Sequence, residues 1–284
     1  MEKKGTIIQA EGFFPSDKRW LYYRRFSTKV NKKGDILGIH GFLEHSGRYE
    51  ELGMSLVKKG YNFYMLDLTG HGRSQGKMRT HINSIEDYLT DIANFYAFLK
   101  VHRSIETPFL FGHSMGGLLA TVFSTWGKCP VKGLVLSAPF FGTKQPIPFF
   151  TLLMAKLISS VYPGFSLPGN IDPGTLSHDP EIVEDYITDP LVERRVNASA
   201  FLHVYKTMKK IQFLAPHVKV PCLIFHGESD AVNDVEASRR FFYSLGTSKK
   251  DLYIVKDAYH EVFNEKGRDQ LLLKLLEWLN SENK

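Results

Sequence analysis

Short apolar runs recur along the chain, and most of them precede a turn and a segment with helical periodicity. The runs occupy residues 36–39, 61–66, 109–111, 134–136, 222–225 and 252–255, and the helical segments occupy residues 48–59, 85–101, 115–126, 235–244 and 267–279. Residues 6–14 and 20–26 are rich in β-formers on either side of a Pro-Ser-Asp turn, which predicts an antiparallel pair. The alternation of strands and helices predicts an α/β fold, with a mostly parallel central sheet and helices on both faces.

The segment from residue 140 to residue 216 breaks this rhythm, because it contains no strand candidate. It holds an apolar helix at 148–162, a turn region rich in proline and glycine, and helices that begin at Pro180 and Val196. Such a connection is far longer than the usual link between neighbouring strands. We therefore expect residues 140–216 to form an inserted helical cap above the C-terminal ends of the strands, and residues 1–139 and 217–284 to form the core.

The composition of the 284 residues excludes several classes of protein. Apolar residues make up 43% and charged residues 23%, a balance typical of a globular chain. The two cysteines, Cys129 and Cys222, fit neither a disulfide framework nor a thiolate metal site, and they favour a cytoplasmic location. The N-terminus lacks the apolar run of a secretory signal, and the longest apolar stretch, 147–158, is too short to span a membrane.

The formal net charge of +6 is concentrated in residues 1–33. A nucleic-acid-binding surface would spread basic residues along a groove with stacking aromatic residues, so we expect no nucleic-acid partner. A solvated basic face on the N-terminal hairpin explains the pattern, and contact with an anionic membrane surface is the alternative.

The sequence Gly112-His113-Ser114-Met115-Gly116 is a G-x-S-x-G motif. The motif alone is weak evidence, but here it lies between a buried strand and a helix. A serine on such a sharp turn has a strained backbone, and its small neighbours allow the hydroxyl to project. We therefore predict that Ser114 is a nucleophile rather than an ordinary serine at a helix N-terminus.

A nucleophilic serine needs a general base and a carboxylate that orients the base. In hydrolases with this turn, the three residues follow one another in the order serine, acid, histidine. His260 follows the strand at 252–255 and is the predicted base. Asp230 follows the preceding strand and is the predicted acid, with Asp234 and Asp257 as alternatives.

The oxyanion of such a reaction requires two backbone N–H donors. Met115, the residue after the nucleophile, is expected to supply one, and Phe42, in the turn after the strand at 36–39, the other. Residues 67–76 fall short of a dinucleotide-binding fingerprint, and the chain has no phosphate-binding P-loop motif. No nucleotide is therefore expected.

Several motifs then follow one another along the chain: HGFLEHSGRY at 40–49, GHGRS at 70–74, GHSMGG at 112–117 and AYHE at 258–261. Together they resemble the monoacylglycerol lipase and lysophospholipase-like serine hydrolases, which have the α/β-hydrolase fold. The resemblance extends over residues 10–280 and includes the cap segment Asp189-Pro190-Leu191. It implies the same nucleophile, acid, base and oxyanion donors as the reasoning from the residues.

The resemblance also implies a polar end of the pocket. Glu44 and Arg48 stand where the family places groups near the glycerol of the substrate, and Tyr186 of the cap is a further substrate-binding candidate. Glu44 and Arg48 are four residues apart, so they equally suit a structural ion pair that orients the oxyanion turn. Both interpretations remain open at this point.

The function implied is that of a serine esterase that hydrolyses long-chain monoacylglycerols to fatty acid and glycerol. Lysophospholipase and broad-specificity carboxylesterase are alternative activities, and a non-catalytic ligand-binding protein with the same fold is the alternative from another class. No metal or cofactor is implied.

The apolar helix at 148–162 has two interpretations. It packs wholly against the upper edge of the sheet and the other cap helices, or it lines an acyl tunnel and contacts the membrane from which a lipid ester enters. In the second interpretation the basic N-terminal segment assists the peripheral membrane contact.

Overall fold

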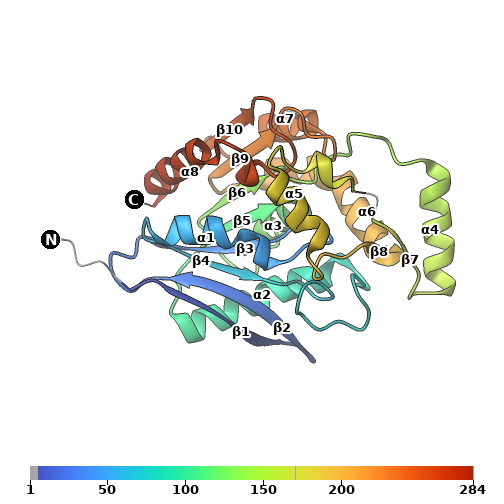
Figure 1. The fold of residues 1–284 in the computed structure, drawn as a ribbon, viewed down its shortest axis with the longest axis horizontal. Coiled ribbons are helices and arrows are strands. Elements are labelled where there is room, and N and C mark those ends of the chain that lie inside the picture. The colour runs from blue at the N-terminus through green and yellow to red at the C-terminus, as the bar shows by residue number, and fades with distance from the viewer. Residues whose placement is uncertain (1–5, 170, 284) are drawn as a thin grey trace.

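The computed structural model describes residues 6–169 and 171–283. In this part of the chain, eight strands form one sheet in the order β1-β2-β4-β3-β5-β6-β9-β10, and helices cover it on both sides (Figure 1). Strands β1, β2 and β4 pair antiparallel and the other neighbours pair parallel, which confirms the predicted sheet. The strands are β1 Ile8–Ser16, β2 Arg19–Ser27, β3 Gly34–Ile39, β4 Tyr61–Leu66, β5 Phe109–His113, β6 Gly133–Ser137, β9 Cys222–Gly227 and β10 Lys250–Val255.

Successive side chains of the central strands enter two hydrophobic cores. In β5, Leu110 faces the core of α2, α3, α6 and α7, whereas Phe109 and Phe111 face the core of α1 and α8. Because neighbouring side chains of a strand point to opposite faces, a strand buried on both faces appears as an unbroken apolar run. The helices outside the cap segment are α1 Glu50–Val57, α2 Ile85–Arg103, α3 Met115–Thr125, α7 Val235–Ser244 and α8 Arg268–Glu282, close to their predicted bounds.

The segment predicted as a helical cap also contains two strands, so the expectation of no strand there was wrong. The two strands pair antiparallel and are three residues long. A strand of this length shows no alternating pattern, and Pro168 argues against a strand in the sequence. The elements of this segment are α4 Phe149–Val161, β7 Ser166–Pro168, α5 Pro180–Thr188, β8 Arg195–Asn197 and α6 Ala198–Leu214.

Helix α6 packs in two directions. Its residues Val204, Met208 and Ile211 join the core formed with α2 and α3. Ala198 and Leu202 instead contact α4. We therefore propose residues 140–216 as a cap that is attached to the core through α6.

Helix α4 is exposed over most of its surface and extends away from the sheet (Figure 1). Of its thirteen residues, all described, only Ala155 is buried. Phe149 is 78% exposed and Val161 is 87% exposed. The helix therefore does not pack wholly against the sheet and the other cap helices, and that interpretation is wrong. Helix α6 covers only one stripe of α4, and most of the remaining surface is exposed.

The basic residues of the N-terminal hairpin have acidic neighbours. Arg19 lies 3.5 Å from Asp91, and Arg24 lies 3.8 Å from Glu11. Residues 1–5, which contribute Lys3 and Lys4 to the basic segment and belong to the predicted core, lie outside the described residues. Within residues 6–169 and 171–283, no helix is long and apolar enough to cross a membrane.

Leu110 provides a test of the core, since its side chain is fully buried in the central strand β5. We expect Leu110→Ala to lower the free energy of unfolding by about 2–5 kcal/mol, because it leaves a cavity that the packed core cannot close. Urea unfolding followed by circular dichroism measures the change. Leu273→Ala, at a residue of α8 that is 57% exposed, is the control, and an equal loss in both variants would contradict this assignment of the core.

Candidate active site

Ser114 lies at the sharp junction between β5 and α3. Its backbone has φ 51° and ψ −116°, a conformation that residues with a side chain rarely adopt. The flanking glycines permit the turn: a Cβ on Gly112 would lie 2.3 Å from the carbonyl oxygen of Gly116. A Cβ on Gly116 would lie 2.1 Å from the carbonyl oxygen of Ile39. The predicted strand–serine–helix turn is therefore present, and both glycines of the motif are required by sterics.

His260 and Asp230 are in direct contact at the C-terminal edge of the sheet. Nδ1 of His260 lies 2.8 Å from Oδ2 of Asp230. The other carboxylate oxygen accepts the backbone N–H groups of Val232 and Asn233 at 2.8 and 2.9 Å. Since a carboxylate only accepts, Nδ1 of His260 carries the proton and Nε2 is left as an acceptor. That tautomer is the one that a serine hydroxyl requires.

Burial and charge act in opposite directions on this pair. Burial alone would lower the pKa of His260, but the carboxylate of Asp230 raises that pKa above its ordinary value. Burial alone would raise the pKa of Asp230, but His260 and His226 hold it well below its usual range. Asp230 is therefore ionised at neutral pH, and His260 is more basic than a free imidazole.

His260 also lies beside His113, the residue that precedes Ser114. The rings of His260 and His113 have centroids 4.8 Å apart. Burial, and then the neighbouring His260, lowers the pKa of His113 to about 3. His113 is therefore neutral, and it places an uncharged ring beside His260.

The two alternative acids lie elsewhere. Asp234 caps α7 by accepting the N–H of Glu236, and it also accepts a hydrogen bond from Arg240. Asp257 is exposed and has a left-handed backbone with φ 57°. The structure thus brings Asp230, and neither alternative, into contact with His260.

Two residues that the sequence analysis did not single out also touch this group. Nε2 of His226, in β9, lies 3.1 Å from Oδ2 of Asp230, and Nδ1 lies 2.8 Å from a serine hydroxyl of α7. The side-chain amide of Asn233 lies 3.4 Å from Oγ of Ser114. The only sequence signal for these two contacts is that both residues are close to Asp230 in the sequence. Hydrophobic periodicity does not predict polar contacts.

The turn after β3 lies directly against Ser114. A Cβ on Gly41 would lie 3.3 Å from Cβ of Ser114. The N–H of Gly41 donates to Glu44, whereas that of Phe42 donates to no group within residues 6–169 and 171–283. Met115 is the first residue of α3, so its N–H has no intrahelical acceptor. Both predicted oxyanion donors therefore lie next to the turn of Ser114 without a competing acceptor.

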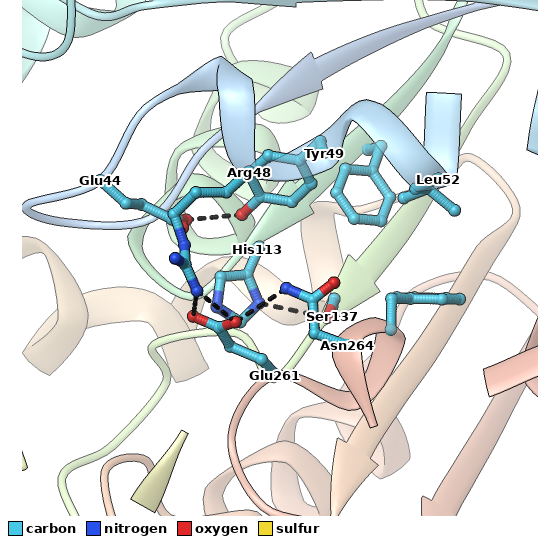
Figure 2. Close-up of a pocket in the computed structure, with 10 residues that line it drawn as sticks. Glu44, Arg48, Tyr49, Leu52, His113, Ser137, Glu261 and Asn264 are labelled. Atoms are coloured by element: carbon cyan, nitrogen blue, oxygen red, sulfur yellow. Dashed lines mark hydrogen bonds and ion pairs between the residues drawn. The ribbon is translucent and has the colours of Figure 1, made fainter. Parts of the chain in front are cut away.

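Glu44, Arg48 and Tyr186 lie together, in a buried network that Glu261 completes. Figure 2 shows Glu44, Arg48 and Glu261 of this network. Nη2 of Arg48 donates to both carboxylate oxygens of Glu261 at 2.8 and 2.7 Å. Nε of Arg48 lies 3.3 Å from Oε2 of Glu44. The ring of Tyr186 lies 4.8 Å from the guanidinium of Arg48. The structure brings the three predicted residues together, and it adds a carboxylate next to His260 in the chain.

The opposing effects on His260 give a test by NMR titration. We expect Asp230→Asn to lower the pKa of His260 below its ordinary value, because burial then acts without the carboxylate. Titration of the imidazole ¹⁵N signals measures this pKa. Asp257→Asn is the control, and a pKa of His260 that responds to Asp257→Asn but not to Asp230→Asn would contradict the assignment.

Comparison with known proteins extends this picture. A sequence profile of the family described as serine aminopeptidase S33 matches residues 30–267. The monoacylglycerol lipase of Mycolicibacterium smegmatis is 26% identical over 262 residues, which cover 92% of this chain and 93% of that protein. An uncharacterized abhydrolase domain-containing protein of Dictyostelium discoideum is 30% identical over 93% of this chain, and the chain spans 28% of its length.

A solved structure agrees with these sequence matches. The crystal structure of the Paleococcus ferrophilus monoacylglycerol lipase has a TM-score of 0.84 and 34% identity, covering 92% of this chain and 99% of that one. The expected resemblance and fold are thereby confirmed. The chain belongs to the serine aminopeptidase S33 family, and it is a serine ester hydrolase with the α/β-hydrolase fold that is similar to the monoacylglycerol lipases.

Proposed function

We propose that the protein hydrolyses the ester bond of long-chain monoacylglycerols, with Ser114 as the nucleophile, and releases fatty acid and glycerol. The observation that carries the proposal is the 2.8 Å contact between His260 and Asp230 beside the strained turn of Ser114. The similarity to lipases of Mycolicibacterium smegmatis and Paleococcus ferrophilus that are named for this substrate supports it.

The reaction proceeds in two halves. Oγ of Ser114 attacks the ester carbonyl carbon while Nε2 of His260 takes the hydroxyl proton, and Asp230 stabilises the imidazolium. The N–H groups of Phe42 and Met115 hold the oxyanion. The proton then passes from His260 to the departing glycerol oxygen, which leaves an acyl-serine. A water molecule deprotonated by His260 attacks the acyl group, so that fatty acid leaves and Ser114 regains its proton.

The alternative activities differ either in the alcohol part of the ester or in the kind of bond that is cleaved. A lysophospholipase or a broad carboxylesterase would use the same steps on another alcohol. An aminopeptidase would need a carboxylate for the ammonium of its substrate, but Glu44 and Glu261 are both engaged by Arg48. A non-catalytic binding protein has no need of a strained serine next to an ionised acid and its histidine. These observations favour ester hydrolysis.

The proposal includes contact of the cap with a membrane surface. Helix α4 exposes Phe149, Phe150, Leu157, Val161 and the adjoining Tyr162, of which Phe150 is 69% exposed. Soluble monomers rarely expose a large contiguous apolar surface that binds nothing. An amphiphilic substrate resides in membranes, so an exposed apolar helix of the cap provides a surface that meets the membrane.

The cap itself carries cations that attract anionic lipids in the proposed contact. Residues 141–169 and 194–216 include Lys144, Lys156 and Lys209 and contain no Asp or Glu. The basic N-terminal segment was expected to assist. Of this segment, the loop that joins β2 and β3 lies on the opposite side of the molecule from α4, whereas the turn between β1 and β2 does not (Figure 1). Cations near α4 are therefore better placed to meet anionic headgroups.

Ser114→Ala tests the proposed nucleophile. We expect kcat for release of dodecanoic acid from monododecanoylglycerol to fall at least about 10³-fold, and labelling by a fluorophosphonate probe to disappear. Ser281→Ala on α8 serves as the control. Retention of more than a tenth of the parent activity would exclude Ser114 as the nucleophile. A lysophospholipid with the same acyl chain tests the alternative alcohol, and a higher kcat/KM on it would overturn the monoacylglycerol assignment.

The exposed face of α4 is tested by the double variant Phe149→Asp with Phe150→Asp. We expect its binding to anionic vesicles to weaken by at least about 10-fold, because two aromatic side chains no longer enter the interface. Hydrolysis of a short water-soluble ester should stay within about two-fold of the parent. Val101→Asp, at an exposed apolar residue of α2, is the matched control. Unchanged vesicle binding in the α4 variant would rule out this contact surface.

A further inference from the structure

We infer that Glu261 is a positioning residue of the proposed reaction, because it connects the loop of His260 to the oxyanion turn through Arg48 and Glu44. The inference rests on the proposed function, and it assigns to this network a role other than holding the glycerol of the substrate. Its basis is a continuous chain of buried contacts between the two loops.

The guanidinium of Arg48 lies at the centre of this chain of contacts. It makes a two-pronged hydrogen bond to Glu261 at 2.8 and 2.7 Å, and on its other side it approaches Glu44 at 3.3 Å. All three side chains are about 6% exposed. Figure 2 shows Arg48 lying between the two carboxylates, with His113 beside them. Both contacts to Glu261 come from Nη2 and are charge-assisted, so they hold the two side chains tightly together.

At one end of these contacts, Glu44 binds the oxyanion turn. Oε1 of Glu44 accepts the N–H of Gly41 at 2.5 Å and the hydroxyl of Tyr49 at 2.5 Å. The bond to Gly41 orients a peptide group immediately before the N–H of Phe42. Because an oxyanion donor acts only when it points at the developing charge, the position of Glu44 sets the quality of this donor.

The Glu261 end acts on the loop of the base. Oε2 of Glu261 also accepts the side-chain amide of Asn264 at 2.8 Å, and its backbone N–H donates to the carbonyl of Leu176 in the cap at 2.8 Å. Glu261 and His260 are consecutive residues, so a shift of the carboxylate moves the imidazole as well. Two contacts therefore hold Glu261 while it binds Arg48.

The same arrangement leaves little of Arg48 for a substrate alcohol. Its guanidinium is bound to Glu261, flanked by Glu44 and covered by the ring of Tyr186 at 4.8 Å. A glycerol that bound to Arg48 would have to displace a buried ion pair and leave a carboxylate without its partner. Between the two interpretations of Glu44 and Arg48, the contacts favour the ion pair that orients the turn.

Glu261→Gln separates the two roles, because it removes the charge and keeps the size of the side chain. We expect kcat to fall about 10- to 100-fold, by the same factor for a glycerol ester and a p-nitrophenyl ester of one acyl chain, with KM nearly unchanged. Glycerol binding predicts instead a raised KM for the glycerol ester alone.

The pH profile supplies a second readout. Burial lowers the pKa of His260, Asp230 raises it most, and Glu261 and Glu44 raise it further, while His113 and Arg48 also lie close by. Loss of the Glu261 charge should therefore move the acid limb of the pH–kcat/KM profile to lower pH. A role confined to folding would lower the melting temperature and leave this limb in place.

Two further variants complete the design. Glu51→Gln is the matched control, since Glu51 pairs with Arg268 at the surface and should change neither kinetics nor pH profile. Arg48→Met combined with Glu261→Met removes both charges of the pair. The two single variants, Arg48→Met and Glu261→Met, are measured alongside it. If the two residues act as a unit, the double variant should lose about as much kcat as the less active single variant. Independent residues would give the product of the two single losses.

The outcomes are distinct. A loss confined to the glycerol ester would overturn the inference in favour of substrate binding, and unchanged kcat with an unmoved acid limb would overturn it in favour of a structural role. If Glu261→Gln does not fold, Glu261→Asp keeps the charge on a shorter side chain. The inference then requires an equal loss of kcat on both esters, and full activity would overturn it. A parent protein inactive on both esters would contradict the proposed function instead.

Discussion

The carboxylate of Asp230 is 1% exposed, and a buried charge is stable only when hydrogen bonds and opposite charge replace the water that it has lost. Two backbone N–H groups of the following loop and two imidazoles surround this carboxylate. These partners fix the loop, and they also fix the tautomer of His260. Because Asn233 donates its backbone N–H to Asp230 and places its side chain beside Ser114, compensation of one charge also positions Asp230 relative to Ser114.

A second buried charge, that of Arg48, organises the opposite side of the site. Its two carboxylate partners come from the segment after β3 and from the loop after β10, which are far apart in the sequence. The parallel sheet brings the C-terminal ends of its strands to one edge, but it does not fix the loops that leave them. Buried ion pairs between loops supply that constraint. The two charge systems meet at the consecutive residues His260 and Glu261, so a change in one is felt by the other.

Much of this arrangement could be predicted from the sequence, and the rest could not for physical reasons. Strands buried on both faces appear as apolar runs, and their order placed Asp230 and His260 at neighbouring strand ends. The short strands β7 and β8 have no such pattern. The spacing of Glu44 and Arg48 indicated a pair, but the partner Glu261 lies 213 residues from Arg48, and only the folded loops bring it near.

The sequence left the exposure of α4 open, because an apolar helix suits both a position covered by the protein itself and contact with a membrane. The proposed cap has two parts, which differ in what they contact. The α5 side is tied to the oxyanion segment, since the N–H of Glu193 donates to the carbonyl of Leu43 at 2.8 Å and His45 bonds to Asp189 at 2.8 Å. The α4 side instead rests on α6 through Ala155 and its neighbours. In the proposed membrane contact, a surface that binds α4 leaves in place the contacts of the α5 side with the oxyanion turn, so lipid binding by the cap stays separate from bond cleavage in the core.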